Sequence, residues 1–224
     1  MDKQMYTPAT PATEGGVLSQ NKVLRQTYTL LSATLLFSGL MAGVSMALAV
    51  PPMFSMVSTI GAIVILMFVL PRFAEQAAGI GIVFLATGLL GFGLGPILNA
   101  YLALPNGASV VMTAMGGTGA IFLALSAYVL TTKKDFSFMG GFLMVGIMVV
   151  FGAIILSLFV NMPALSLAIS GAMVLLMSGF ILFDTSRIIN GGETNYVMAT
   201  VSLFINIFNL FVSLLQLLGI MSND

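Results

Sequence analysis

Seven long apolar runs divide this chain, and their lengths constrain its fold more than any other feature. Each is close to the ~20 residues that a helix needs to cross the hydrocarbon core of a bilayer. They cover about residues 27–50, 53–70, 77–98, 108–130, 138–160, 164–186 and 196–219. Only 6% of the 224 residues are charged, whereas roughly a quarter is usual in a soluble domain. The sequence therefore predicts an all-α polytopic membrane protein with seven transmembrane helices.

The connections between the runs are short and rich in turn-forming residues. They contain Pro51 and Pro52, Pro71, Pro105 to Gly107, Asn161 to Pro163, and Gly191 and Gly192. Such residues end helices and form turns. Sequential helices should therefore be antiparallel neighbours, and residues 22–224 should form a single transmembrane domain.

Residues 1–21 are polar, contain Pro8, Pro11, Gly15 and Gly16, and have few large apolar groups. We predict that they form a disordered cytoplasmic tail, with a mean reach of ~25 Å for about 20 flexible residues. The first apolar run, preceded by Lys22 and Arg25, is also compatible with a cleavable signal peptide. It is longer than the ~7–15 residues of a signal core, so we favour an uncleaved first span.

The basic residues indicate the orientation of the chain in the membrane. Alternating spans place all seven on one side, and the opposite connections contain none: Lys3, Lys22, Arg25, Arg72, Lys133, Lys134 and Arg187. The positive-inside rule makes this side cytoplasmic. We therefore expect the N-terminus in the cytoplasm and the C-terminus in the periplasm.

The last run carries a polar stripe. Its members recur at spacings of three and four residues, which places them on one face of a helix: Ser202, Asn206, Asn209, Ser213 and Gln216. Amide groups facing lipid would lack hydrogen-bond partners at a high energetic cost. We therefore predict that the last helix is central and that the other six helices pack around it.

Glycine residues indicate where helices approach closely. Gly39 and Gly43 form a GxxxG pattern in the first run, and four glycines occupy the third: Gly88, Gly91, Gly93 and Gly95. Small residues at this spacing are typical of helix–helix contacts in membranes. No strand precedes the glycines of the third run, so we do not interpret them as a nucleotide-binding loop.

The composition excludes several classes of function. The chain has no Cys and no His, which removes disulfides, Cys/His metal sites, Ser-His-Asp triads and Cys-His pairs. The net charge is zero, so we expect no nucleic-acid partner. An aspartyl intramembrane protease needs two carboxylates, and the spans contain one. We expect neither an enzyme nor a cofactor.

That single carboxylate, Asp184, is the candidate for an intramembrane site. Arg187 follows it by three residues and lies on the same face of a helix, which favours an ion pair at the membrane interface. Alternatively, Asp184 faces the stripe of the last helix and contacts Asn206. Asn206 lies about ten residues, or ~15 Å, into that helix from its cytoplasmic end. Both interpretations stay open, because ionisable groups within spans are often functional.

Several motifs resemble the Bax inhibitor 1 (TMBIM) family. They are Ile181 to Ser186, Gly191 to Tyr196 and Asn206 to Phe211, together with Gly95 to Asn99 and Ser126 to Asp135, which resemble the bacterial YccA-like branch. The similarity runs from about residue 20 to the end. The resemblance implies seven helices with the last one central, in a bacterial inner-membrane protein that binds and restrains the membrane-anchored AAA protease FtsH.

One residue departs from the family pattern. Family members that leak calcium have an Asp on the last helix, paired with the Asp of helix six, whereas this chain has Asn206. The resemblance also implies that a basic side chain from the connection after span two pairs with the two acidic positions. In this chain Arg72 is the basic residue in that connection. The alternative function is therefore a pH-sensitive leak for Ca²⁺, another cation or H⁺, and the simplest alternative is a structural polar seam. Membrane lipid is an expected partner in every case.

Overall fold

The computed structural model describes residues 12–160 and 162–222, and it describes only the helical backbone of residues 12–20. All secondary structure in these residues is helical. The elements are α1 (Ala12–Ala47), α2 (Pro52–Val64), the π-helix η1 (Ile65–Val69), α3 (Leu70–Phe73), α4 (Ala77–Leu102), α5 (Gly107–Thr132), α6 (Met139–Ser157), α7 (Pro163–Ile189) and α8 (Tyr196–Met221). Seven segments are long and apolar enough to cross a membrane, with α2, η1 and α3 forming one of them. The predicted class and the seven spans are confirmed.

Helix α1 extends beyond its membrane-spanning part. The helix begins at Ala12, whereas the apolar segment runs over Asn21–Ala47. Residues 1–11 of the expected tail lie outside the described residues. The disorder of residues 1–21 and the division of the chain at residue 22 stay predictions.

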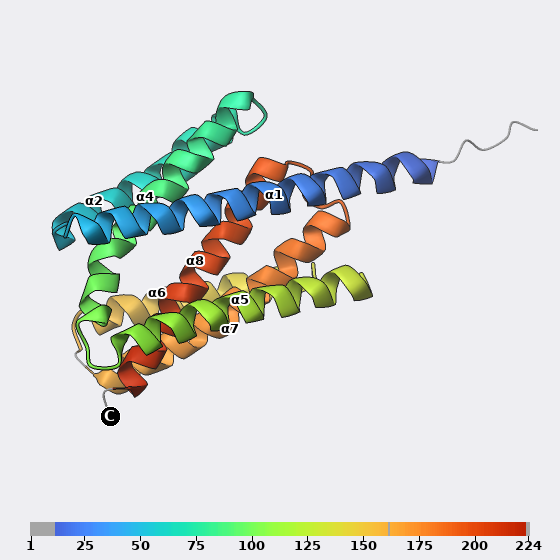
Figure 1. The fold of residues 1–224 in the computed structure, drawn as a ribbon. Helices are drawn as coiled ribbons and strands as arrows, with labels where there is room; N and C mark the ends of the chain where they lie inside the picture. Colours follow the sequence, from blue (N-terminus) through green and yellow to red (C-terminus); the bar gives the residue numbers. More distant parts are fainter. Residues whose placement is uncertain (1–11, 161, 223–224) are drawn as a thin grey trace, which may run out of the picture.

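The spans form two groups of three, and α8 connects them. Figure 1 shows α1, α2 and α4 together on one side of α8, and α5, α6 and α7 on the other. α8 packs against α1, α5 and α7, and less extensively against α4. α2 packs mainly on α4, and α6 on α7. The expectation that all six other helices surround α8 is therefore not confirmed, although α8 does lie between the two groups.

Proline positions explain several helix boundaries. Pro52 and Pro163 occupy first turns, where the missing N–H has no intrahelical partner to lose. Pro71 lies inside the second span, where it cannot donate to the carbonyl group one turn back. The wider π-turn of η1 directly precedes it, and the Leu70 N–H donates to the Ile65 carbonyl oxygen. A π-turn of this kind accommodates a local break in the hydrogen-bond pattern.

The glycines of α4 lie where α1 and α2 approach most closely. A Cβ atom at Gly88 would overlap the ring of Phe37, and one at Gly91 would overlap the carbonyl oxygen of Ser38. The expected close packing is confirmed for α4. It is wrong for Gly39 and Gly43 on α1, which are exposed and would have nothing within 4 Å of an added Cβ atom. The α1–α4 contact uses the glycines of α4 instead, so those of α1 are left facing outward.

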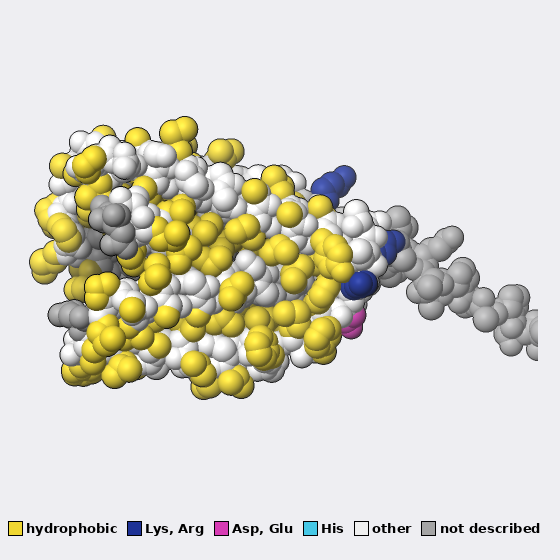
Figure 2. Space-filling model, turned by 90° about the horizontal axis from the view of Figure 1, so that it is seen from below, with side chains coloured by type: hydrophobic (Ala, Val, Ile, Leu, Met, Phe, Trp, Pro, Cys, Tyr) yellow, Lys and Arg dark blue, Asp and Glu magenta, His cyan; other side chains and the backbone are white. Residues whose placement is uncertain are grey.

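Charged side chains gather at one end of the molecule. Figure 2 shows dark blue Lys and Arg side chains at the end where α1 begins, and hydrophobic side chains over the rest of the visible face. Apolar side faces with charges confined to an end are typical of a protein surrounded by lipid. The assignment of this end to the cytoplasm stays a prediction.

Candidate functional site

The candidate site lies between α7 and α8. The amide nitrogen Nδ2 of Asn206 donates a hydrogen bond of 2.7 Å to Oδ2 of Asp184. Asn206 is only 6% exposed, and Asp184 is partly buried. A buried amide without a partner is costly. The contact therefore satisfies the amide and gives the carboxylate a donor.

The packing of α8 against α7 brings these two side chains together. Asp184 precedes the end of α7 by five residues, or about 8 Å, whereas Asn206 lies ten residues, or about 15 Å, into α8. If the end of α7 and the start of α8 were level, the two side chains would lie at different depths. The hydrogen bond between them therefore implies that these two helix ends are offset along the helix axes.

The polar stripe meets α7 at a second position. Ser170 of α7 donates a hydrogen bond of 3.3 Å from its hydroxyl group to Oε1 of Gln216. Ser213, between the two contacts, is buried. Asn209 behaves differently, because its Nδ2 donates to the carbonyl oxygen of Ile205 in its own helix at 2.9 Å. Ser202 is half-buried. Two members of the stripe, Asn206 and Gln216, therefore contact α7. Gln216 is nevertheless exposed, although we expected the stripe to be covered.

Neither basic candidate forms an ion pair with Asp184 in the described residues. Nη2 of Arg187 lies 3.7 Å from Oε2 of Glu193 and donates to the Gly192 carbonyl oxygen at 3.2 Å. Its guanidinium carbon lies 5.6 Å from the centre of the Phe183 ring. Arg72 is exposed at the end of α3. The partner that the structure gives Asp184 is thus the Asn206 amide.

Ser186 is a second polar centre that sequence reasoning quoted only as part of a motif. It is fully buried, and its hydroxyl oxygen accepts from the Phe136 N–H at 2.8 Å and from Nδ2 of Asn190 at 3.2 Å. The bond from Phe136 ties the α5–α6 connection to α7, two residues after Asp184. Beside it, hydrogen bonds from Ser137 lower the pKa of the exposed Asp135 carboxyl group. No periodicity marks Ser186, because its partners come from a connection far away in the sequence.

Near the same end, four hydroxyl groups are buried without a hydrogen-bond partner among the described residues. They belong to Thr27 and Tyr28 of α1, Ser126 of α5 and Thr185 of α7. Thr200 of α8 reaches this region as well, since its hydroxyl group lies 3.3 Å from the Thr27 carbonyl oxygen. The described residues contain no group of three or more Asp or Glu side chains that could hold a metal ion. Chemically, the site offers one carboxylate with an amide partner.

The chain is similar to known proteins over nearly its whole length. The sequence model of the family described as inhibitor of apoptosis-promoting Bax1 matches residues 20–223. A protein named modulator of FtsH protease YccA, from Escherichia coli K12, is 50% identical over 208 residues, which cover 93% of this chain and 94% of that protein. An uncharacterized membrane protein of Vibrio cholerae is 50% identical over 207 residues, covering 92% and 93%. An uncharacterized protein of Pseudomonas aeruginosa is 50% identical over 202 residues, covering 90% of each chain.

Proposed function

Because this chain belongs to the Bax inhibitor 1 family, we propose that it is an inner-membrane protein that binds and restrains a membrane-anchored AAA protease of the FtsH type. The observation that carries the proposal is the 50% identity, over 93% of this chain, to the E. coli protein named a modulator of that protease. An E. coli O6:H1 relative, equally similar, is named an inner membrane protein. Seven apolar spans fit a multi-pass protein of that membrane.

The distribution of polar groups supports binding over catalysis. Asp184 has an amide as its hydrogen-bond partner, and an acid–base pair for hydrolysis would require a second titratable group at the reacting position. The Lys and Arg side chains that Figure 2 shows lie at the end of the spans where α1 begins. This end is the one we expect in the cytoplasm, and the N-terminal residues that precede α1 would be accessible there.

Co-purification from native membranes tests this proposal. The affinity-tagged chain, solubilised in a mild detergent, should retain the protease, whereas an unrelated seven-span protein of similar abundance should not. In a pulse-chase experiment, overproduction of the chain should lengthen the half-life of a membrane substrate of the protease severalfold. Failure to retain the protease, together with an unchanged substrate half-life, would exclude the proposal.

A cation or proton leak is the second candidate, because the structure places a carboxylate against a buried amide between two spans. Polar groups in this position are found along ion pathways in membrane proteins. The site departs from a pair of carboxylates that share a proton, since its second member is Asn206. Flux in liposomes containing the native protein, abolished by Asp184→Asn, would support the leak; flux equal to that of empty liposomes would exclude it.

A further inference from the structure

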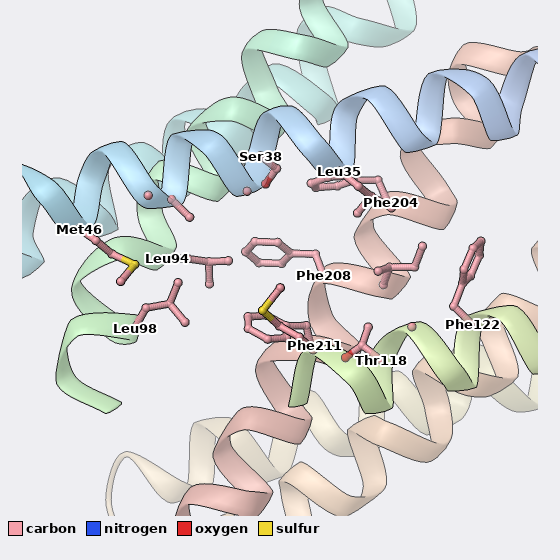
Figure 3. Close-up of a pocket in the computed structure, with 16 residues that line it drawn as sticks. Leu35, Ser38, Met46, Leu94, Leu98, Thr118, Phe122, Phe204, Phe208 and Phe211 are labelled. Atoms are coloured by element: carbon pink, nitrogen blue, oxygen red, sulfur yellow. The ribbon is translucent and has the colours of Figure 1, made fainter. Parts of the chain in front are cut away.

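An apolar cavity opens between α1 and α5, and Asp184 is not part of its lining. Its volume is about 450 Å³, and its walls come from α1, α4, α5 and α8. Figure 3 shows Phe208 of α8 pointing into the cavity. Met46 and Leu98 lie at one end, and Phe122 lies at the other.

Glycine residues leave this cavity open on its outer side. Gly39 and Gly43 of α1 and Gly119 of α5 line it, and an added Cβ atom at any of them would meet nothing within 4 Å. All three lie within membrane-spanning segments. The opening therefore faces the hydrocarbon of the bilayer, and what enters it must come from the membrane.

A membrane offers two kinds of occupant, an acyl chain of a lipid or a helix of another protein. The dimensions of the cavity distinguish between them. Its lining on α1 runs from Leu35 to Met46, twelve residues that rise about 16 Å along the helix. A helix with its side chains is about 10–12 Å across, so 16 Å of it would occupy more than about 1,200 Å³. The cavity, at about 450 Å³, cannot enclose it. The length matches one leaflet, which is about half of the ~30 Å hydrocarbon core.

The chemistry of the lining also fits a hydrocarbon chain. Its two hydroxyl residues are Ser38 and Thr118, and the Thr118 hydroxyl group donates to the Ala114 carbonyl oxygen at 2.7 Å. No charged side chain lines the cavity. An apolar chain gains little by leaving the surrounding lipid, because both environments are apolar. Retention therefore depends on close packing against side chains such as Phe208.

We propose that this cavity binds one acyl chain of a phospholipid from the leaflet opposite the basic end of the protein. Met46 lies next to the last residue of α1, the end farthest from Lys22 and Arg25. The head group would lie beyond Met46, and the chain terminus would reach toward Phe122. The connections at that end contain no charged residue, so the site selects an acyl chain and not a head group.

Photolabelling in lipid nanodiscs tests the proposal without altering the protein. The probes are phosphatidylethanolamines with a diazirine group either near the carboxyl end or near the terminus of one acyl chain. The first should label α1 near Met46, and the second should label α5 near Phe122, each severalfold above the exposed α6 residues Met144 and Met148. Phosphatidylglycerol probes should give the same pattern. Equal labelling of the cavity and α6, or no dependence on the diazirine position, would overturn the proposal.

A second experiment repeats the photolabelling on variants whose side chains fill the cavity. The double variant Gly39→Leu/Gly119→Leu should reduce labelling of the remaining lining severalfold, because both side chains enter open space. Gly152→Leu is the matched control, since Gly152 of α6 is equally open but lies outside the cavity. Labelling unchanged by the double variant would overturn the proposal. So would photocrosslinking at position 39 in native membranes that yields a protein adduct instead of a lipid adduct.

Discussion

At the scale of single residues, the hydrogen bond between Asp184 and Asn206 determines how a carboxylate is accommodated between two spans. The amide of Asn206 is nearly fully buried and lies 2.7 Å from the carboxylate oxygen. Losing one partner of a buried pair costs more than the pair itself contributes, because the other group keeps its desolvation penalty. The two residues should therefore behave as a unit.

The first prediction concerns this coupling. Asn206→Ala should lower the stability of the protein in detergent by about 1–3 kcal/mol, because Asp184 loses its donor. The double variant Asp184→Ala/Asn206→Ala should lose clearly less than the two single variants together. Thermal unfolding followed by circular dichroism measures both. Strictly additive losses would show that the pair is not energetically coupled.

The second prediction concerns the effect of replacing the Asn206 amide with a second carboxylate. Asn206→Asp would place two carboxylates within hydrogen-bond distance, and two such groups share a proton because both cannot ionise cheaply. We expect this variant to show pH-dependent cation flux in liposomes, while the native protein shows little. Asn209→Asp is the control, since the Asn209 amide bonds to its own helix. Strong native flux that persists in Asp184→Asn would contradict the assignment of both residues.

At the scale of helices, glycines with the same sequence pattern have opposite surroundings. Gly91 of α4 contacts the backbone of α1, whereas Gly39 of α1 faces open space. A backbone carbonyl group cannot move aside as a flexible side chain can. The two helices of one contact therefore contribute unequally, and the cost of a methyl group depends on which helix carries it.

The third prediction follows from this difference. Gly91→Ala should destabilise the protein by about 1–3 kcal/mol, the usual range for overpacking, because its Cβ atom would overlap the Ser38 carbonyl oxygen. Gly39→Ala should leave the unfolding temperature unchanged or slightly raised, since alanine favours the helix. Thermal unfolding of both variants in one detergent gives the comparison. Equal losses at the two positions would contradict the α1–α4 packing described here.

At the scale of the whole molecule, α8 joins two three-helix groups, and the basic residues lie at one end of the assembly. Seven membrane crossings would place the two termini on opposite sides of the membrane. The fourth prediction is that a reporter fused after Asp224 is active only in the periplasm, and that one inserted between Lys133 and Lys134 is active only in the cytoplasm. The positive-inside rule gives this direction. Cytoplasmic activity at both positions would mean that α8 does not cross the membrane.

The fifth prediction concerns the N-terminal segment. Deletion of residues 2–18 should leave the seven-span fold intact, because these residues have little apolar surface to bury. We also expect slower turnover of the protein itself, because cytoplasmic proteases engage unstructured chain ends. A pulse-chase experiment on the full-length and shortened chains measures the half-life. An unchanged half-life would count against this segment as the point of engagement.

The sequence alone determined the features that depend on local pattern. Run length and scarcity of charge predict seven spans, because the thickness of a bilayer fixes the length of a helix that crosses it. The spacing of Asn206, Ser213 and Gln216 predicts a polar face, since 3.6 residues complete a turn. These inferences need no knowledge of which helices are neighbours.

Only the tertiary structure decided which helices meet. The stripe shows that Asn206 needs a partner, but the packing of α8 against α7 brings it to Asp184 and leaves Arg187 to pair with Glu193. The GxxxG pattern of Gly39 and Gly43 indicates a contact that α1 makes instead through Ser38 and the glycines of α4. The cavity beside them arises from side chains of four helices. The helical period determines which residues share one face of a helix. Which other helix that face contacts depends on how all the helices pack together.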